Sequence, residues 1–144
     1  MKPKICIVMS TYNNDITNGM FNMAKVKLSN FGIKKIDLIK VPGAFEIPVA
    51  ISKLIKKYDG FIAIGCIIKG ETANFDLISR SITDGIMQLS IINKKPIGNA
   101  IITAFNKNQA ETRLNKGTEA ASAVLEVLKI KWFLKRSPMI IQGL

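Results

Sequence analysis

The segment Phe61-Ile-Ala-Ile-Gly-Cys-Ile-Ile68 is the most hydrophobic stretch of the 144-residue chain, and it decides the fold class. A continuous apolar run of this length, without polar alternation, is typical of a strand buried on both faces of a parallel sheet. Three further short runs have the same character: Lys4–Met9, Ile36–Val41 and Pro96–Thr103. The sequence therefore predicts four strands.

Helical patterns fill the intervals between these runs. The first helix follows Asp15 and is expected to stop at Gly32, because glycine favours the left-handed conformation found after many helices. Its apolar face consists of Met20, Ala24, Leu28 and Phe31. Further helices are expected from Gly43 to about Lys57, after Lys69–Thr72, over Asn108–Arg113 and from near Gly117.

Alternation of strands and helices predicts an α/β fold. We expect a three-layer α/β/α arrangement, with a four-stranded, mainly parallel sheet flanked by helices on both faces. The length fits one domain over residues 1–144. Ligands of such sheets bind outside the carboxyl ends of the strands. The loops at 10–15, 41–46, 69–74 and 103–107 are therefore the expected ligand-binding region.

Composition narrows the function classes. A net charge of +11 is compatible with nucleic acid, an anionic membrane or phosphate-bearing substrates. The lysines are scattered along a chain rich in Ile, Lys and Asn, which favours codon drift, so we expect no nucleic-acid and no membrane partner. The absence of histidine excludes Ser-His and Cys-His nucleophiles, and Cys6 and Cys66 lie in apolar runs rather than at metal-binding spacing. Without a signal peptide or an apolar stretch that could span a bilayer, a cytoplasmic location is expected.

Three of the loops carry residues suited to binding. Tyr12 offers an aromatic ring, Glu46 a carboxylate at a helix start, and Thr72 lies after a glycine where a helix N-terminus can bind an anion. Each also has an ordinary structural explanation. The tyrosine can pack on the sheet edge, the glutamate can be a solvated first-turn carboxylate, and the threonine can be an N-cap. Taken singly, these structural explanations are the commoner ones.

Taken together, the loops resemble the lumazine synthase family. Val41-Pro-Gly-Ala-Phe-Glu-Ile-Pro48 is similar to the signature segment of these enzymes. Gly65-Cys-Ile-Ile-Lys-Gly-Glu-Thr72 resembles their phosphate-binding strand end, and the stretch from Gln109 to Ala121 resembles their C-terminal segment. The resemblance runs from the first strand to about Lys131, so residues 132–144 are expected to form a C-terminal extension.

The resemblance implies a role for each position that contacts the pyrimidine substrate. An aromatic ring stacks on the pyrimidine at Tyr12, which Asn13 follows, and strand backbone reads its edge at Cys66 and Ile68. The ribityl chain is held by backbone amides and a carboxylate, which fall at Ala44, Phe45 and Glu46.

The resemblance also implies how the phosphate substrate is bound. Its amide donors fall at Glu71 and Thr72. Arg113 matches an arginine that a neighbouring subunit contributes to the phosphate, and Lys116 matches a lysine near the same site. These residues imply a binding site that two subunits share.

Two positions depart from the family pattern. The family's histidine, its proposed proton-transfer group, is replaced by Asn74. A phenylalanine usual at the subunit contact of the fourth strand is replaced by Asn99. We expect Asn74 and Arg113 to be the catalytic positions and Asn99 to contact substrate, and the shorter segment between Arg113 and Lys116 bears on assembly.

The resemblance implies an enzyme that condenses 5-amino-6-ribitylaminouracil with 3,4-dihydroxy-2-butanone 4-phosphate, without metal or cofactor. The alternative is a flavin- or lumazine-binding scaffold or shell protein with little catalysis, which Asn74 supports. A homo-oligomer is expected, and a pentamer is favoured over a larger shell. Small residues in the last helix suit close packing between subunits: Ala120, Ala121 and Ala123.

Overall fold

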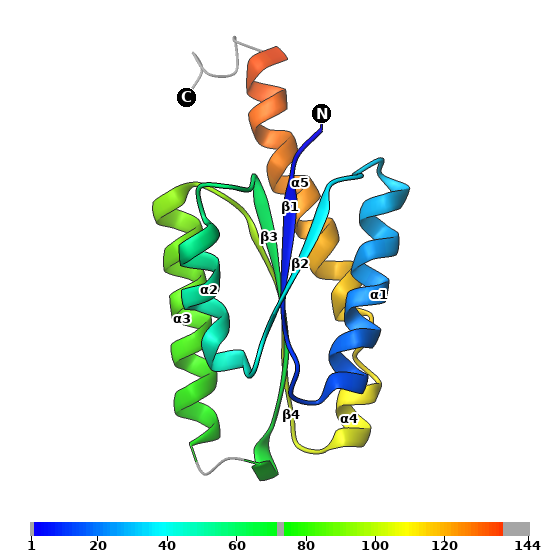
Figure 1. Ribbon diagram of the computed structural model, residues 1–144, viewed down its shortest axis with the longest axis vertical. Coiled ribbons are helices and arrows are strands. Elements are labelled where there is room, and N and C mark those ends of the chain that lie inside the picture. Colours follow the sequence, from blue (N-terminus) through cyan, green and yellow to red (C-terminus); the bar gives the residue numbers. More distant parts are fainter. Residues whose placement is uncertain (1, 72–73, 137–144) are drawn as a thin grey trace.

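The computed structural model describes residues 2–71 and 74–136 and shows one four-stranded sheet between two helical layers (Figure 1). The strands are β1 (Ile5–Ser10), β2 (Ile36–Val41), β3 (Gly60–Ile68) and β4 (Ile97–Ala104). They lie in the order β2-β1-β3-β4, and every pairing between them is parallel. The predicted α/β/α fold is confirmed.

The helices divide between the two faces of the sheet. α1 (Asn14–Asn30) and α5 (Lys116–Arg136) cover one face, and α2 (Ile47–Leu54) and α3 (Phe75–Asn93) cover the other (Figure 1). The short α4 (Lys107–Glu111) follows β4, and single 3-10 turns follow β2 and β3: η1 (Ala44–Glu46) and η2 (Lys69–Glu71). None of the helices in the described ranges is long and apolar enough to cross a membrane.

The two central strands form the core of the sheet. All six residues of β1 and all nine of β3 are buried. Their side chains alternate between the layers, so that Ile7 packs toward α1 and α5 whereas Val8 packs toward α2 and α3. Burying an isoleucine or valine side chain stabilises a fold by roughly 1.5–3 kcal/mol. These strands are therefore the most firmly held part of the sheet.

Cys6 belongs to this buried core. Burial, followed by the nearby charge of Asp37, raises the pKa of its thiol to about 12. Because the thiolate is the reactive form of cysteine, Cys6 is inert at neutral pH.

Phe31 corrects the prediction for the first helix. Met20, Ala24 and Leu28 are buried as predicted, but the Phe31 side chain is 50% exposed. α1 ends at Asn30 and the chain turns at Gly32, whose φ is +80°. The Phe31 ring therefore leaves the helix face, and two ammonium groups lie over it, those of Lys27 (4.8 Å) and Lys129 (5.6 Å).

The alanines of α5 also differ from prediction. Ala120 and Ala121 are buried within the chain's own core, so the expectation that they pack between subunits is wrong, whereas Ala123 is exposed. α5 approaches β4 so closely that a Cβ on Gly98 would overlap the Ala120 carbonyl oxygen. Small side chains at this contact serve the packing of helix on sheet.

Several helix boundaries are shifted from their predicted positions. α2 ends at Leu54 rather than at about Lys57. α3 begins at Phe75, with Asn74 in the cap position, because η2 occupies Lys69–Glu71. α4 covers Lys107–Glu111, earlier than predicted, and α5 starts one residue early, at Lys116. Thr72, the predicted start of α3, lies outside the described residues.

Gly117→Ala is expected to destabilise the protein. A Cβ on Gly117 would overlap the Met20 carbonyl oxygen, where α5 crosses α1. Forcing an added methyl group into such a contact costs typically about 1–3 kcal/mol. Urea denaturation at a fixed protomer concentration measures the loss.

Gly85→Ala is the matched control for this prediction, because Gly85 also lies in a helix. Its added Cβ would meet nothing nearer than Pro48, at 3.5 Å. Alanine is favoured over glycine in helices by about 0.5–1 kcal/mol, so this variant should be neutral or more stable. Equal losses in the two variants would contradict the packing explanation.

Candidate active site

The loops at the carboxyl ends of β1 and β2 are fastened together. The backbone N–H of Thr11 donates to the Val41 carbonyl at 2.8 Å, and that of Tyr12 donates to the Pro42 carbonyl at 3.1 Å. These bonds continue the pairing of β1 with β2 beyond the last strand residues. The backbone that carries the Tyr12 ring is therefore held by the sheet.

Asn13 joins the first loop to β3. Its side-chain Nδ2 donates to the Cys66 carbonyl oxygen at 3.2 Å. The residue adopts the left-handed conformation, with φ 59° and ψ 51°, which asparagine tolerates better than most residues. Asn13 also precedes α1, so one residue turns the chain into a helix and fastens it to the neighbouring strand end.

The second loop is closed by Glu46. Its Oε1 accepts the Gly43 N–H at 2.9 Å, while the Glu46 N–H donates to the Gly43 carbonyl at 3.2 Å. This reciprocal pair fixes the carboxylate at the start of a helix. Close approach of this loop to β3 requires Gly65, because a Cβ there would lie 3.2 Å from the Ala44 Cβ.

A groove of about 460 Å³ lies between these two loops and β3. Two aromatic side chains at its rim are well exposed, Tyr12 at 49% and Phe45 at 63%. The groove is lined by Tyr12, Pro42, Gly43, Ala44, Phe45, Glu46, Cys66, Ile67, Ile68 and Ile78. Six predicted site residues are thus gathered in one place. We call this the ring groove.

Two predicted site residues, Arg113 and Lys116, lie in a different groove. This second groove, of about 450 Å³, is lined by Ile101, Ile102, Thr103, Thr112, Arg113, Asn115, Lys116 and Glu119. It follows the free edge of β4 and the start of α5, and it shares no lining residue with the ring groove. The Arg113 Nη1 donates to the Thr103 carbonyl at 2.7 Å, and because a guanidinium group has five N–H donors, the side chain can bond to a ligand as well. We call this the arginine groove.

The segment between β4 and α4 is also well fixed. Asn106 caps α4 by accepting the Gln109 N–H at 2.8 Å, and Gln109 Oε1 accepts the Phe105 N–H at 2.7 Å. Lys107 forms an exposed ion pair with Asp15 at 2.9 Å. The hydrogen bond from Lys107, together with its charge, lowers the pKa of the Asp15 carboxyl.

The remaining predicted site residues are placed differently. Asn74 is exposed at the cap of α3, where its carbonyl accepts the Ile78 N–H at 2.9 Å. Asn99 is exposed midway along β4, paired with Ala63 rather than with the strand ends, and its Oδ1 accepts the Ile101 N–H at 2.9 Å. It does not join the ring groove within the chain. Thr72 and the side chain of Glu71 lie outside the described part of the structure.

Two residues that line the ring groove could be predicted from the sequence only as core residues. The apolar run of β3 and the spacing of α3 indicate that Ile67 and Ile78 are buried, but both also line the ring groove. No sequence signal distinguishes them from other core isoleucines. Within the described ranges, no cluster of three or more Cys, Asp or Glu side chains could hold a metal ion, and the chain has no histidine.

Comparison with known proteins agrees with this geometry. Residues 2–131 match the 6,7-dimethyl-8-ribityllumazine synthase family. The chain belongs to this family. Among curated relatives, the 6,7-dimethyl-8-ribityllumazine synthase of Albidiferax ferrireducens is 40% identical over 90% of this chain and 85% of its own length.

Other bacterial proteins of the same name are similarly related. The Agrobacterium fabrum protein is 37% identical over 90% of this chain and 95% of its own length. That of Buchnera aphidicola is 42% identical over 90% of this chain and 87% of its own length. The ring groove and the arginine groove both fall inside the region that matches the lumazine synthase family. This region ends at residue 131, and α5 continues for five more residues.

Proposed function

We propose that the chain is a lumazine synthase that condenses 5-amino-6-ribitylaminouracil with 3,4-dihydroxy-2-butanone 4-phosphate. An imine forms between the amine and the ketone, phosphate leaves, and the ring closes with loss of water to give 6,7-dimethyl-8-ribityllumazine. The observation that carries the proposal is the ring groove, with Tyr12 and Glu46 at the carboxyl ends of adjacent strands. We expect the reaction to occur in the cytoplasm.

The ring groove suits the pyrimidine substrate. The exposed Tyr12 ring offers a flat surface on which the pyrimidine can stack, and the backbone of Cys66 and Ile68 lies along the groove to read its edge. Ala44, Phe45 and the carboxylate of Glu46 are placed to bind the hydroxyl groups of the ribityl chain. Asn13 acts by holding the β1 loop against Cys66.

The phosphate requires cations and backbone N–H groups. The start of α3 offers the N-terminal amides of a long helix, a favourable place for an anion. Arg113 and Lys116 lie in the separate arginine groove, so we propose that they reach the phosphate of a neighbouring subunit. Under this proposal the active form is a homo-oligomer, with a pentamer the favoured size. The exposed edge of β4 and Asn99 belong to the same contact.

The chemistry proposed here depends mainly on bringing two molecules together. Well-oriented reactants gain an effective molarity that reaches roughly 10⁵–10⁸ M. The departing phosphate can accept a proton beside Arg113, and Asn74 can orient a substrate hydroxyl or a water through its amide.

The second candidate function, a lumazine- or flavin-binding scaffold, is favoured only by Asn74 in place of an imidazole. Formation of product from the two purified substrates, followed by absorbance, distinguishes enzyme from scaffold.

Arg113→Ala is expected to weaken use of the four-carbon phosphate far more than use of the pyrimidine. Charge-assisted bonds contribute on the order of 1.5–3 kcal/mol, which corresponds to roughly 10- to 150-fold in kcat/KM for the phosphate substrate. Steady-state kinetics with each substrate varied in turn measure the two effects. Equal losses for both substrates would indicate that Arg113 has only a structural role.

Mixing two variants, each impaired in one groove, tests whether the site is shared. Arg113→Ala leaves the ring groove intact, and Glu46→Ala leaves the arginine groove intact. After joint refolding at equal amounts, about one quarter of subunit contacts should join two intact grooves if assembly is head-to-tail. Activity should therefore return to about a quarter of the unmodified value. Absence of any recovery, with co-assembly verified, would place both residues in the site of one chain.

Asn74→His is expected to raise the turnover rate and to add a pH dependence near about 6.5, the ordinary pKa of imidazole. A positioned general base contributes typically 10²–10⁴-fold, and a carboxamide cannot take up a proton near neutral pH. The unmodified enzyme should be slow, with no titration of this kind. Turnover against pH for both forms is the measurement. An unchanged rate and profile in the variant would show that position 74 moves no proton.

A further inference from the structure

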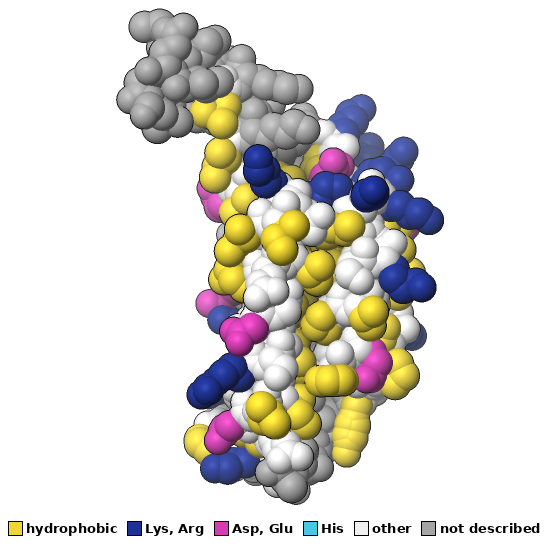
Figure 2. Space-filling model, turned by 90° about the vertical axis from the view of Figure 1, so that its left-hand side faces the viewer, with side chains coloured by type: hydrophobic (Ala, Val, Ile, Leu, Met, Phe, Trp, Pro, Cys, Tyr) yellow, Lys and Arg dark blue, Asp and Glu magenta, His cyan; other side chains and the backbone are white. Residues whose placement is uncertain are grey.

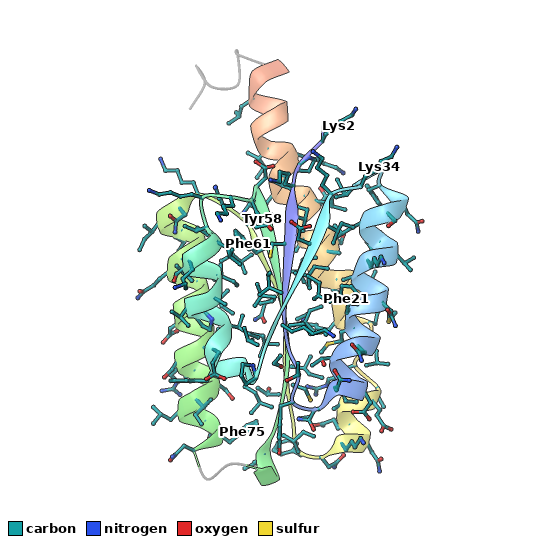
Figure 3. The ribbon with its side chains drawn as sticks, viewed as in Figure 1. Lys2, Phe21, Lys34, Tyr58, Phe61 and Phe75 are labelled. Atoms are coloured by element: carbon teal, nitrogen blue, oxygen red, sulfur yellow. The ribbon has the colours of Figure 1, made fainter. Side chains whose placement is uncertain are left out.

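The lysines that are scattered along the sequence are gathered at one end of the molecule. This end comprises the amino ends of the strands, the last two turns of α1, α2 and α5, and the segment after α3 (Figure 1). We call it the lysine pole. Twelve lysines whose side chains the structure describes belong to it: Lys2, Lys4, Lys25, Lys27, Lys34, Lys35, Lys53, Lys56, Lys57, Lys94, Lys95 and Lys129. Figure 2 shows basic side chains grouped near this end, and Figure 3 shows Lys2 and Lys34 there, opposite Phe75.

Outside the lysine pole, the described side chains carry no excess charge. Six cationic side chains face an equal number of carboxylates. The cations are Lys40, Lys69, Arg80, Lys107, Arg113 and Lys116, and the carboxylates are Asp15, Glu46, Asp76, Asp84, Glu111 and Glu119. The pole itself has twelve lysines and only three carboxylates, Asp37, Asp59 and Glu126. The positive charge of the described chain is therefore confined to the end away from the ring groove.

The carboxylates of the lysine pole do little to neutralise it. Asp59 Oδ2 accepts the backbone N–H of Lys4 at 2.8 Å, and Asp37 Oδ2 accepts the Tyr58 hydroxyl at 2.6 Å. Among the described residues, the only ion pair at the pole is that of Lys129 with Glu126, at 3.1 Å. Nine of the twelve lysines are exposed. These nine side chains are therefore accessible to an external polyanion, although the ammonium groups of Lys4 and Lys25 also lie over the rings of Tyr58 and Phe21.

Fold stability explains only part of this arrangement. Helix C-termini favour cations through the macrodipole, which accounts for lysines such as Lys27 and Lys53 in last helical turns. Lys34, Lys35 and Lys57 lie outside helices, where that effect is absent. Clustered like charges also repel one another, so fold stability alone does not account for the pole.

We propose that the lysine pole binds nucleic acid without sequence preference. Exposed ammonium groups suit the closely spaced phosphates of a nucleic acid, and lysine bonds to phosphate as a point charge without reading bases. A membrane surface is less suitable because the helices meet the pole end-on, so no amphipathic helix lies flat to insert an apolar face. The Phe31 ring is covered by two ammonium groups. The expectation of no nucleic-acid partner depended on scattered lysines, and the structure removes that basis.

The test is binding of the full chain to a fluorescein-labelled 20-nucleotide RNA and a 20-base-pair DNA, followed by anisotropy from 50 to 200 mM salt. Affinity should fall steeply with salt and differ little between unrelated sequences. Lys34→Glu with Lys57→Glu should weaken binding at least about tenfold at 50 mM salt and lower the salt slope by roughly two. Lys40→Glu with Arg80→Glu makes the same change of charge away from the pole and should weaken binding less than about twofold.

Three outcomes would overturn the proposal. Absence of binding at 50 mM salt would show that the pole has no affinity for nucleic acid. Equal losses in the two double variants would show that net charge, rather than the pole, causes the binding. Co-sedimentation with phosphatidylglycerol vesicles, lost in the Lys34→Glu and Lys57→Glu variant and without binding to either oligonucleotide, would assign the pole to a membrane. Circular dichroism of each variant verifies that it is folded.

Discussion

β1 and β3 have no polar face, so helices must cover the sheet on both sides, and this constraint sets the position of everything else. Each helix runs back antiparallel to the strands, which brings all the strand ends of one kind to one edge. Loops that are distant in sequence then meet beside Cys66. The backbone bonds of Thr11 and Tyr12 to the second loop extend the rigidity of the buried strands into the ring groove.

Much of the fold could be predicted from local pattern. The apolar run Phe61–Ile68 and the helical spacing of Met20, Ala24 and Leu28 report burial directly, because side chains in these positions have no alternative but the core. Polar residues such as Asp37, Lys40 and Asn99 distinguish β2 and β4 from the fully buried β1 and β3, but local pattern does not show which of these strands lie side by side. Phe31 was misplaced for a related reason: periodicity cannot show that a helix ends one residue earlier.

The parts of the candidate site that come from one continuous segment of the chain could be predicted from the sequence. The parts that depend on contacts between distant segments were harder to predict. Val41–Pro48 carries its own turn and helix start, so Ala44, Phe45 and Glu46 lie together as expected. The left-handed backbone of Asn13 and its bond to Cys66 depend on a contact between residues 53 positions apart. The separation of Arg113 from the ring groove, and the gathering of lysines at the opposite end, follow from packing that no local pattern records.

Under the proposed function, the lack of a histidine at position 74 has a limited effect on the reaction rate. The reason is that a general base lowers the barrier less than the positioning of the two substrates does. Holding reactants in place lowers a barrier by roughly 7–11 kcal/mol, when the geometry is good. A general base of 10²–10⁴-fold effect lowers it by about 3–5 kcal/mol. Under the proposed function, the larger contribution comes from the ring-groove residues, which we propose position the pyrimidine, and from Arg113, which we propose binds the phosphate; neither depends on position 74. If position 74 has the proposed proton-transfer role, an asparagine at the cap of α3 removes the smaller contribution, and the larger one, which comes from the positioning of the substrates, remains.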